Sequence, residues 1–188
     1  LKPLLRSIPP LAQAANEATG TALRVPGAYA LSIVNGAVLG AATAPEGVKV
    51  GTTHGGVLTN RDDVIVSVSN ALTKDTLSLD LKGAIEQVVQ IDHRIEGEAG
   101  HVADATKIFV ADDSSVVILE TFSGSDAAHV GNHASYIALG KNAVVTHVTV
   151  DLSGRETSHF ATNEYHLNDG AQLRTLIVHA GAGLARTH

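Results

Sequence analysis

The sequence predicts an all-β protein of the parallel β-helix class, preceded by a short N-terminal segment with a helix and a hairpin. Two observations carry this prediction. A repeated pattern runs through the second half of the chain, and the composition is 44% hydrophobic but only 3% aromatic. The core must therefore be built from Val, Ile, Leu and Ala. The 18 glycines and many β-branched residues favour short strands joined by turns.

The repeat emerges when residues 110–178 are compared with themselves. Asp113–Leu119 falls on Lys141–His147, which falls on Asp169–Thr175, and Gln87–Ile91 is a fainter copy one step earlier. Each copy has a polar turn, a small residue and a run of β-forming residues. A fixed period of roughly 20–50 residues is typical of a solenoid, in which no unit buries its apolar face alone. An antiparallel sandwich is the alternative.

Stacking the copies at this fixed period predicts which side chains share a column. An aliphatic column is expected to face inward: Val89, Val117, Val145 and Leu173. Because side chains alternate between the two faces of a strand, a second inward column lies two residues further on: Ile91, Leu119, His147 and Thr175. The mixed column between them is expected to face outward: Gln90, Ile118, Thr146 and Arg174. A further column is also expected: Leu81, Phe109, Ile137 and Tyr165.

The chain divides into an N-terminal segment (1–75) and the β-helix coils (76–188). In the first segment, Pro9-Pro10 and the helix-forming composition of Leu11–Glu17 predict a helix, since proline suits a first helical turn. Asn35-Gly36 lies between two apolar runs and predicts a hairpin, because both turn positions need a positive φ.

Further along, Pro45–Gly47 predicts a turn and Thr52–Arg61 a loop. The stretch Asp63–Leu72 is ambiguous: alternating valines suggest a strand, but the two aspartates could equally begin a short helix. Leu77–Leu81 alternates leucine with polar residues, which predicts a one-sided strand.

Composition also narrows the function. The net charge of −6, without a run of Lys or Arg, argues against a nucleic-acid or anionic-membrane partner. No apolar run nears the ~18–20 residues of a membrane span. Cysteine is absent, which excludes disulfides and thiolate ligation by this chain. Since the chain opens on leucine and contains no methionine, we expect a fragment whose last coil, truncated at His188, is covered by missing sequence or a partner.

Histidines are the most visible candidates for a site. His129 and His133 have the spacing of metal ligands on a helix, but Gly131 and Asn132 predict a loop there. His101 and His129 are one repeat apart, so we expect them on adjacent coils, either as metal ligands or bonded to water and backbone. His147, if inward, is expected to be a hydrogen-bonded core residue.

Other polar positions predict no catalytic machinery. Asp112, Asp113 and Asp169 fall in predicted turns, where short polar side chains bond the local backbone. Gly181–Gly183 is expected to be a plain turn rather than a phosphate loop, because no lysine follows it. No nucleophile, base and orienting group can be assembled from spacing.

With the repeats aligned, the sequence resembles the SufB/SufD family of iron–sulfur cluster assembly proteins, and SufD-like members in particular. The similarity covers about residues 28–188 and rests on the order and spacing of five stretches: Ser32–Gly36, Ala44–Val48, Val110–Glu120, Leu167–Ala171 and Gly181–Arg186.

The resemblance implies the N-terminal half of a SufD-like chain, with a right-handed parallel β-helix flanked by helical regions. It implies a cytoplasmic scaffold, not an enzyme, which pairs with a SufB-like paralogue and binds a SufC-like ATPase, with a homodimer as a further possibility. The iron–sulfur cluster would be handled by the full complex. The family's cluster-proximal histidine lies in the other half, so no catalytic, cofactor-binding or metal residue is assigned here.

We therefore expect a structural scaffold, with His147 and Thr175 lining a route for cluster components. Two alternatives remain. A β-helix enzyme acting on carbohydrate would need clustered carboxylates in an outer groove. A metal-binding module would use His101 and His129.

Overall fold

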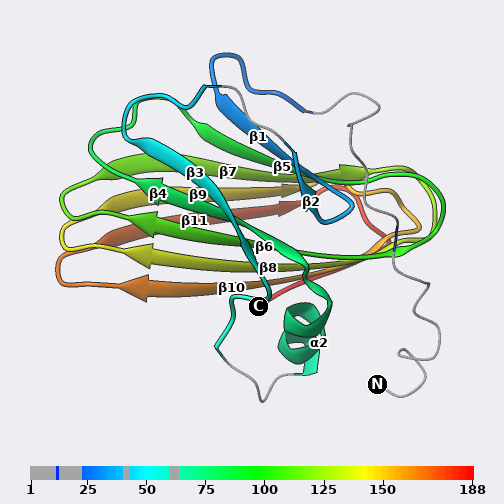
Figure 1. The fold of residues 1–188 in the computed structure, drawn as a ribbon. Helices are drawn as coiled ribbons and strands as arrows, with labels where there is room; N and C mark the ends of the chain where they lie inside the picture. The colour runs from blue at the N-terminus through cyan, green and yellow to red at the C-terminus, as the bar shows by residue number, and fades with distance from the viewer. Residues whose placement is uncertain (1–11, 13–22, 40–42, 60–63) are drawn as a thin grey trace.

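The computed structural model describes residues 12, 23–39, 43–59 and 64–188. Strands stack in parallel from coil to coil and form a β-solenoid of about four turns (Figure 1). The parallel pairing confirms the predicted β-helix class and excludes the antiparallel sandwich. The helix predicted over Leu11–Glu17 lies outside the described residues, apart from Ala12.

Two six-stranded sheets form the walls of the solenoid, and their strands run in opposite directions (Figure 1). The first sheet has the order β11-β9-β7-β5-β1-β2, with β1 Tyr29–Val34, β2 Ala37–Val38, β5 Val89–Ile95, β7 Ser115–Gly124, β9 Val144–Asp151 and β11 Gln172–His179. The second has the order β12-β10-β8-β6-β4-β3, with β3 Val48–His54, β4 Asp75–Leu81, β6 His101–Val110, β8 Val130–Leu139, β10 Ser158–Leu167 and β12 Leu184–Thr187.

The predicted hairpin joins β1 to β2. Asn35 and Gly36 take φ values of 48° and 79°, the left-handed conformation that a tight hairpin turn requires. The predicted turn at Pro45–Gly47 is also present: Val48 N–H donates to Pro45 O at 3.1 Å. The loop predicted from Thr52 begins later, because β3 pairs with β4 as far as His54.

Helix α2, Val64–Leu72, decides the ambiguous stretch in favour of the helix. Its Val66 packs with Leu58 against Ala105 and Ala134, on the outer face of β6 and β8. The small alanines allow the helix to approach the sheet closely. Strand β4 confirms the strand predicted over Leu77–Leu81. No helix in the described part of the chain has the length and hydropathy that a membrane span needs.

The N-terminal segment shares the two sheets with the coils. Strand β1 pairs in parallel with β5, and β3 pairs antiparallel with β4. The division into 1–75 and 76–188 stays a prediction.

The coil length differs from the predicted period in the first coils. Ser115 pairs with Val144, and Val144 pairs with Gln172, so the first of these two steps is one residue longer than the second and than the predicted period. Left-handed turn residues follow the same spacing: Asp113, Asn142 and Gly170 have φ values of 53°, 56° and 71°. Asp, Asn and Gly are the residues that tolerate this conformation best, so the turn fixes where each coil begins.

The one-residue difference changes the predicted columns, because a slip by one residue exchanges the two faces of a strand. Val117 and Phe109 are 40% and 37% exposed, and the prediction that they share interior columns is wrong. Ile118, predicted to face outward, is fully buried, because it pairs with Val89 and His147 in the true inward column. The predictions for Val145 and His147 are confirmed, since both are buried.

Other members of these columns also depart from the prediction. Gln90 is buried although it faces outward, because its side chain bonds the backbone of the segment that includes Val25. Thr175 pairs with His147 but is exposed, because β11 is the edge strand of its sheet.

The interior has two halves. At the end of the solenoid where β6 and β8 finish and β7 and β9 begin, it is aliphatic: Leu79, Leu81, Ile108, Val110, Val116, Ile118, Ile137, Leu139 and Val145 belong to one buried cluster. At the opposite end the inward positions are mainly imidazoles and carboxylates. We call these two regions the aliphatic half and the polar half.

Candidate functional site

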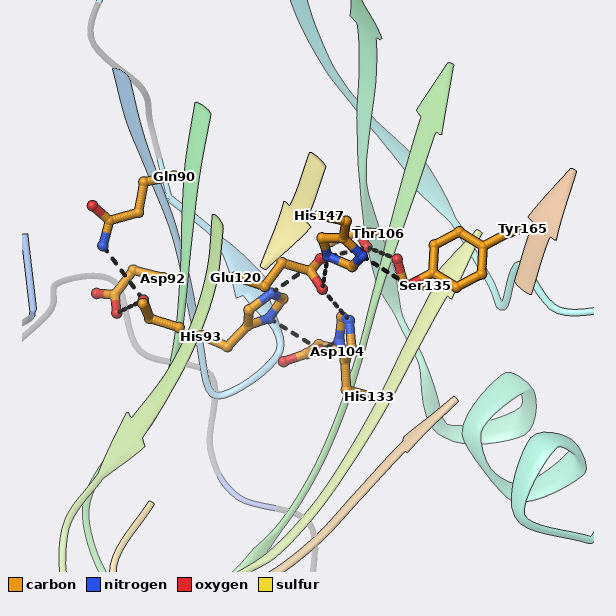
Figure 2. Close-up of polar contacts among 11 residues, drawn as sticks. Gln90, Asp92, His93, Asp104, Thr106, Glu120, His133, Ser135, His147 and Tyr165 are labelled. Carbon is orange, nitrogen blue, oxygen red and sulfur yellow. Dashed lines mark hydrogen bonds and ion pairs between the residues drawn. The ribbon is translucent and has the colours of Figure 1, made fainter. Parts of the chain in front are cut away.

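The polar half contains a buried cluster of five titratable side chains: His93, Asp104, Glu120, His133 and His147 (Figure 2). None is more than 6% exposed, and Glu120 is fully buried. Groups of this kind are rarely buried unless they are paired or bind a ligand. The cluster is therefore the strongest candidate for a functional site in the described residues.

Strand geometry brings the cluster together. Asp104 on β6 and His133 on β8 are register partners, so their side chains stack on adjacent coils. His93 on β5 and Glu120 on β7 come from the opposite sheet, with Glu120 placed inward by the alternation that buries Ile118. His147 on β9 follows Ile118 in the next coil.

Asp104 and Glu120 each contact two imidazoles. The Asp104 Oδ1 atom lies 2.6 Å from Nδ1 of His133 and 3.4 Å from Nδ1 of His93. On the other side of the two rings, Glu120 Oε1 lies 3.7 Å from Nε2 of His93, and Oε2 lies 3.5 Å from Nε2 of His133. Both rings are thus held between the same two carboxylates.

Further hydrogen bonds fix the carboxylate of Glu120. Thr106 Oγ1 donates to Oε1 at 3.0 Å, and Nε2 of His147 lies 3.1 Å from Oε2. Nδ1 of His147 lies 2.9 Å from the Tyr165 hydroxyl. Burial and the charge of Glu120 both raise the pKa of Tyr165, so the hydroxyl keeps its proton and can donate it to His147. This polarity leaves Nε2–H of His147 to donate to Glu120.

The charges of the cluster shift one another's pKa. Burial lowers the pKa of His93, but the neighbouring carboxylates, Asp104 above all, outweigh burial and raise it to about 10. Burial favours neutral Asp104 and Glu120, but the adjacent imidazoles hold both pKa values well below the usual range. Burial and His93 lower the pKa of His133, and the carboxylates raise it above normal. At neutral pH the free cluster therefore contains two carboxylates and at least one imidazolium.

A second polar cluster lies one coil further on, around Asp151. Its Oδ2 atom lies 2.9 Å from Nδ1 of His159 and 3.4 Å from Nδ1 of His179, and Ser153 N–H donates to Oδ1 at 2.9 Å. Burial raises the pKa of Asp151, but the bond and charge of His159 outweigh it and leave the pKa below normal.

An aromatic ring lies between the two clusters. The centroid of the Phe122 ring is 4.5 Å from that of His93, on which it stacks, and 4.4 Å from that of His159. A cavity of about 10 Å³ borders both His93 and His133, close to the minimum volume for one water molecule. The polar half thus has room for a very small ligand.

The predicted histidine pair is not brought together as expected. His101 pairs in register with Val130 rather than with His129. His129 instead lies 2.7 Å from Ser125 Oγ, and burial lowers the pKa of both His101 and His129. The loop predicted around His133 is wrong as well, because Val130–Leu139 is strand β8. The extended backbone places His133 inward, against Asp104.

The turn residues behave as the sequence predicts. Asp112 Oδ1 accepts from Lys141 N–H at 2.7 Å, and Asp113 Oδ1 accepts from Asn142 Nδ2 at 2.9 Å, so these aspartates connect the turns of adjacent coils. The three N–H groups of Gly181–Gly183 donate to backbone carbonyls of the preceding coil. They are not free to bind phosphate, which confirms the plain turn.

Sequence reasoning found His147 but missed His93, Asp104 and Glu120 as site residues. The signal that could have found them is a coil one residue longer than the predicted period, which makes Asp104 the neighbour of His133 and places Ile118 above His147. The shorter, predicted period placed each of these residues one position away from its true neighbour.

Comparisons with known proteins agree with this architecture. A family model described as "SUF system FeS cluster assembly, SufBD core domain" matches residues 93–188, which include most of β5 and all strands from β6 to β12. No curated protein matches the chain.

Proposed function

Because this chain belongs to the SufBD core-domain family of the SUF iron–sulfur cluster assembly system, we propose that it is a scaffold subunit of a SufB–SufC–SufD type complex, structural rather than catalytic. The observation that carries the proposal is the family match over the stacked coils that contain the polar cluster. We infer a SufD-like role, with a SufB-like paralogue and a SufC-like ATPase as partners, in the cytoplasm; a homodimer is the further possibility.

The solenoid suits a scaffold role for a physical reason. Each coil is hydrogen-bonded along its length to the next, through the parallel pairings of β5 with β7, β7 with β9, β6 with β8 and β8 with β10. Such a stack holds surface positions at fixed distances. The buried position of His147 also supports the expected polar route for cluster components through the interior.

The carbohydrate-enzyme alternative is less well supported. Glycoside hydrolysis needs two carboxyl groups on either side of an accessible sugar. Here the closely placed carboxylates are Asp104 and Glu120, which are at most 6% exposed and face the solenoid interior. The aspartates of the turns, Asp112 and Asp113, bond the adjacent coil instead.

The test is co-expression of the full-length protein with its SufB-like and SufC-like partners, followed by affinity capture through the partner. We expect a stoichiometric complex on size-exclusion chromatography with light scattering. We also expect the complex, supplied with ferrous iron and a sulfide source, to develop the visible absorption of an iron–sulfur cluster. A matched preparation that lacks the protein should assemble less cluster. Recovery of neither partner, with unchanged cluster assembly in its absence, would count against the scaffold role.

A further inference from the structure

The geometry of the polar cluster points to a metal site, and we propose that His93, Glu120 and His133 bind one divalent transition-metal ion of the Fe²⁺ or Zn²⁺ type. The candidate ligand atoms of these three residues all lie within 4.8 Å of one another. The proposal goes beyond the scaffold function and does not depend on it.

The distances fit an ion placed between the imidazoles and the carboxylate. Nε2 of His93 and of His133 lie 3.7 Å and 3.5 Å from the two oxygens of Glu120. These separations are too long for good hydrogen bonds. For metal–ligand bonds of about 2.0–2.1 Å in a tetrahedral site, neighbouring ligand atoms are about 3.4 Å apart. A slight contraction of the three side chains would therefore complete the ligand set.

The residues around the three ligands are placed to orient them. Asp104 contacts Nδ1 of both imidazoles, at 2.6 Å for His133 and 3.4 Å for His93, which leaves the Nε2 atoms directed at Glu120. A carboxylate that holds the far nitrogen of a ligating histidine is the usual support of metal sites, because it fixes the tautomer and the ring orientation. Thr106 and His147 hold the carboxylate of Glu120 in the same way.

Unpartnered buried nitrogens are the independent observation that indicates a ligand. Both ring nitrogens of His93 and Nε2 of His133 lack a hydrogen-bond partner, although each residue is only 2% exposed. A buried polar atom without a partner costs free energy, about 1–3 kcal/mol per group. A bound ion would satisfy the Nε2 atoms, and the adjacent cavity of about 10 Å³ would hold a water molecule as an additional ligand.

The donor set selects the class of ion. Two imidazoles and one carboxylate suit borderline ions such as Fe²⁺ and Zn²⁺, and two-histidine, one-carboxylate sets with open positions are typical of iron(II). The chain has no cysteine and no methionine, so it offers no sulfur ligand for a soft ion such as Cu⁺.

The test uses the full-length protein without a histidine tag, stripped of metal by chelation. Co²⁺ is titrated first, because its visible spectrum reports the coordination number. Fe²⁺ under anaerobic conditions and Zn²⁺ then compete with it. We expect one equivalent per chain, and the ion that displaces cobalt at the lower concentration identifies the preferred metal. X-ray absorption should show nitrogen and oxygen ligands with imidazole scattering.

Variants connect the binding to these residues. His93→Ala and His133→Ala should each weaken binding by at least about 100-fold, and Asp104→Asn by about 10–100-fold, as expected for a residue that orients a ligand. His54→Ala is the matched control, because the His54 side chain is 86% exposed and lies outside the polar half; it should bind as the wild type does.

Circular dichroism of each metal-free variant must match the wild type for the comparison to be made. If a variant fails this check, Glu120→Gln, which keeps the shape of the side chain, takes its place. The proposal is wrong if the stripped wild-type protein binds less than one equivalent at millimolar metal, or if folded variants of His93 and His133 bind as tightly as His54→Ala.

Discussion

The aliphatic and polar halves of this solenoid share one backbone, one strand alternation and one coil spacing, but they are stabilised by different physics. Leu79, Ile108 and Ile137 stack as register partners in the aliphatic half and are fully buried. Their burial contributes about 1.5–3 kcal/mol each, independent of pH and of any ligand. In the polar half, Asp104 and Glu120 are buried only because imidazoles lie beside them.

The difference teaches where the molecule can respond to its surroundings. Replacing a buried ion pair by apolar residues is often neutral or stabilising, whereas removal of one partner is strongly destabilising. A protein that needed only stability could therefore fill both halves with aliphatic residues. The polar half is thus better explained by a ligand or by conditional stability than by packing alone.

The largest effect is expected for Glu120→Ala in the polar half. It leaves the positive charge of His93 without one of its two carboxylates in a buried position, and we expect a loss of about 3–5 kcal/mol in the free energy of unfolding. Urea denaturation of the metal-free protein at pH 7 measures it. Thr149→Ala is the control, because Thr149 is the register partner of Glu120 and is also buried but uncharged. Equal losses for the two variants would contradict the role of charge.

Asp151→Asn tests the pH dependence of the second polar cluster. The pKa of Asp151 is depressed in the folded protein, so the stabilisation from its pairing with His159 is present above pH ~4 and is lost as the pH falls below it. At pH 6 we expect the variant to be less stable by about 1.5–3 kcal/mol, the typical range for hydrogen bonds to a charged group.

The measurement is urea denaturation of wild type and variant between pH 6 and pH 3. The difference in unfolding free energy should shrink as the pH falls. A difference that stays constant over this range would show that the carboxylate of Asp151 is not stabilised by its imidazole neighbour.

In the aliphatic half, Ile108→Val removes one buried methylene group and should cost about 0.5–1.5 kcal/mol. The loss should be the same at pH 6 and pH 9 and should not change when metal is added, because no charge is involved. Thermal unfolding at the two pH values, with and without metal, measures it. A pH-dependent loss would mean that the two halves are coupled.

The smallest effect is expected for Tyr165→Phe, at the border between the halves. The variant loses the hydrogen bond from Tyr165 to His147 and should cost about 0.5–1.5 kcal/mol, toward the lower end because the residue is only partly buried. Chemical denaturation measures the loss. NMR of the His147 ring should show a change of tautomer population, whereas an unchanged ring signal would contradict the proposed proton arrangement.

Features that depend on a few neighbouring residues were predicted correctly. The hairpin at Asn35-Gly36 follows from the left-handed conformation that these residues tolerate. The stacked coils follow from the repeat itself. The helix over Val64–Leu72 could not be distinguished from a strand, because its valines satisfy both periods and only packing against Ala105 and Ala134 decides between them.

The sequence by itself determined that the chain forms a solenoid, because a repeated pattern of turn and strand is a local property that every coil expresses independently. It also indicated a polar interior, through His147. Only the tertiary structure decided the composition of the site. Glu120 meets His93 and His133 because each coil closes with two sheets facing each other, and Asp104 meets His133 because that coil is one residue longer than the predicted period. One residue of coil length exchanges inside and outside, so contacts across the interior are decided by the closure of the coils, which no short stretch of sequence encodes.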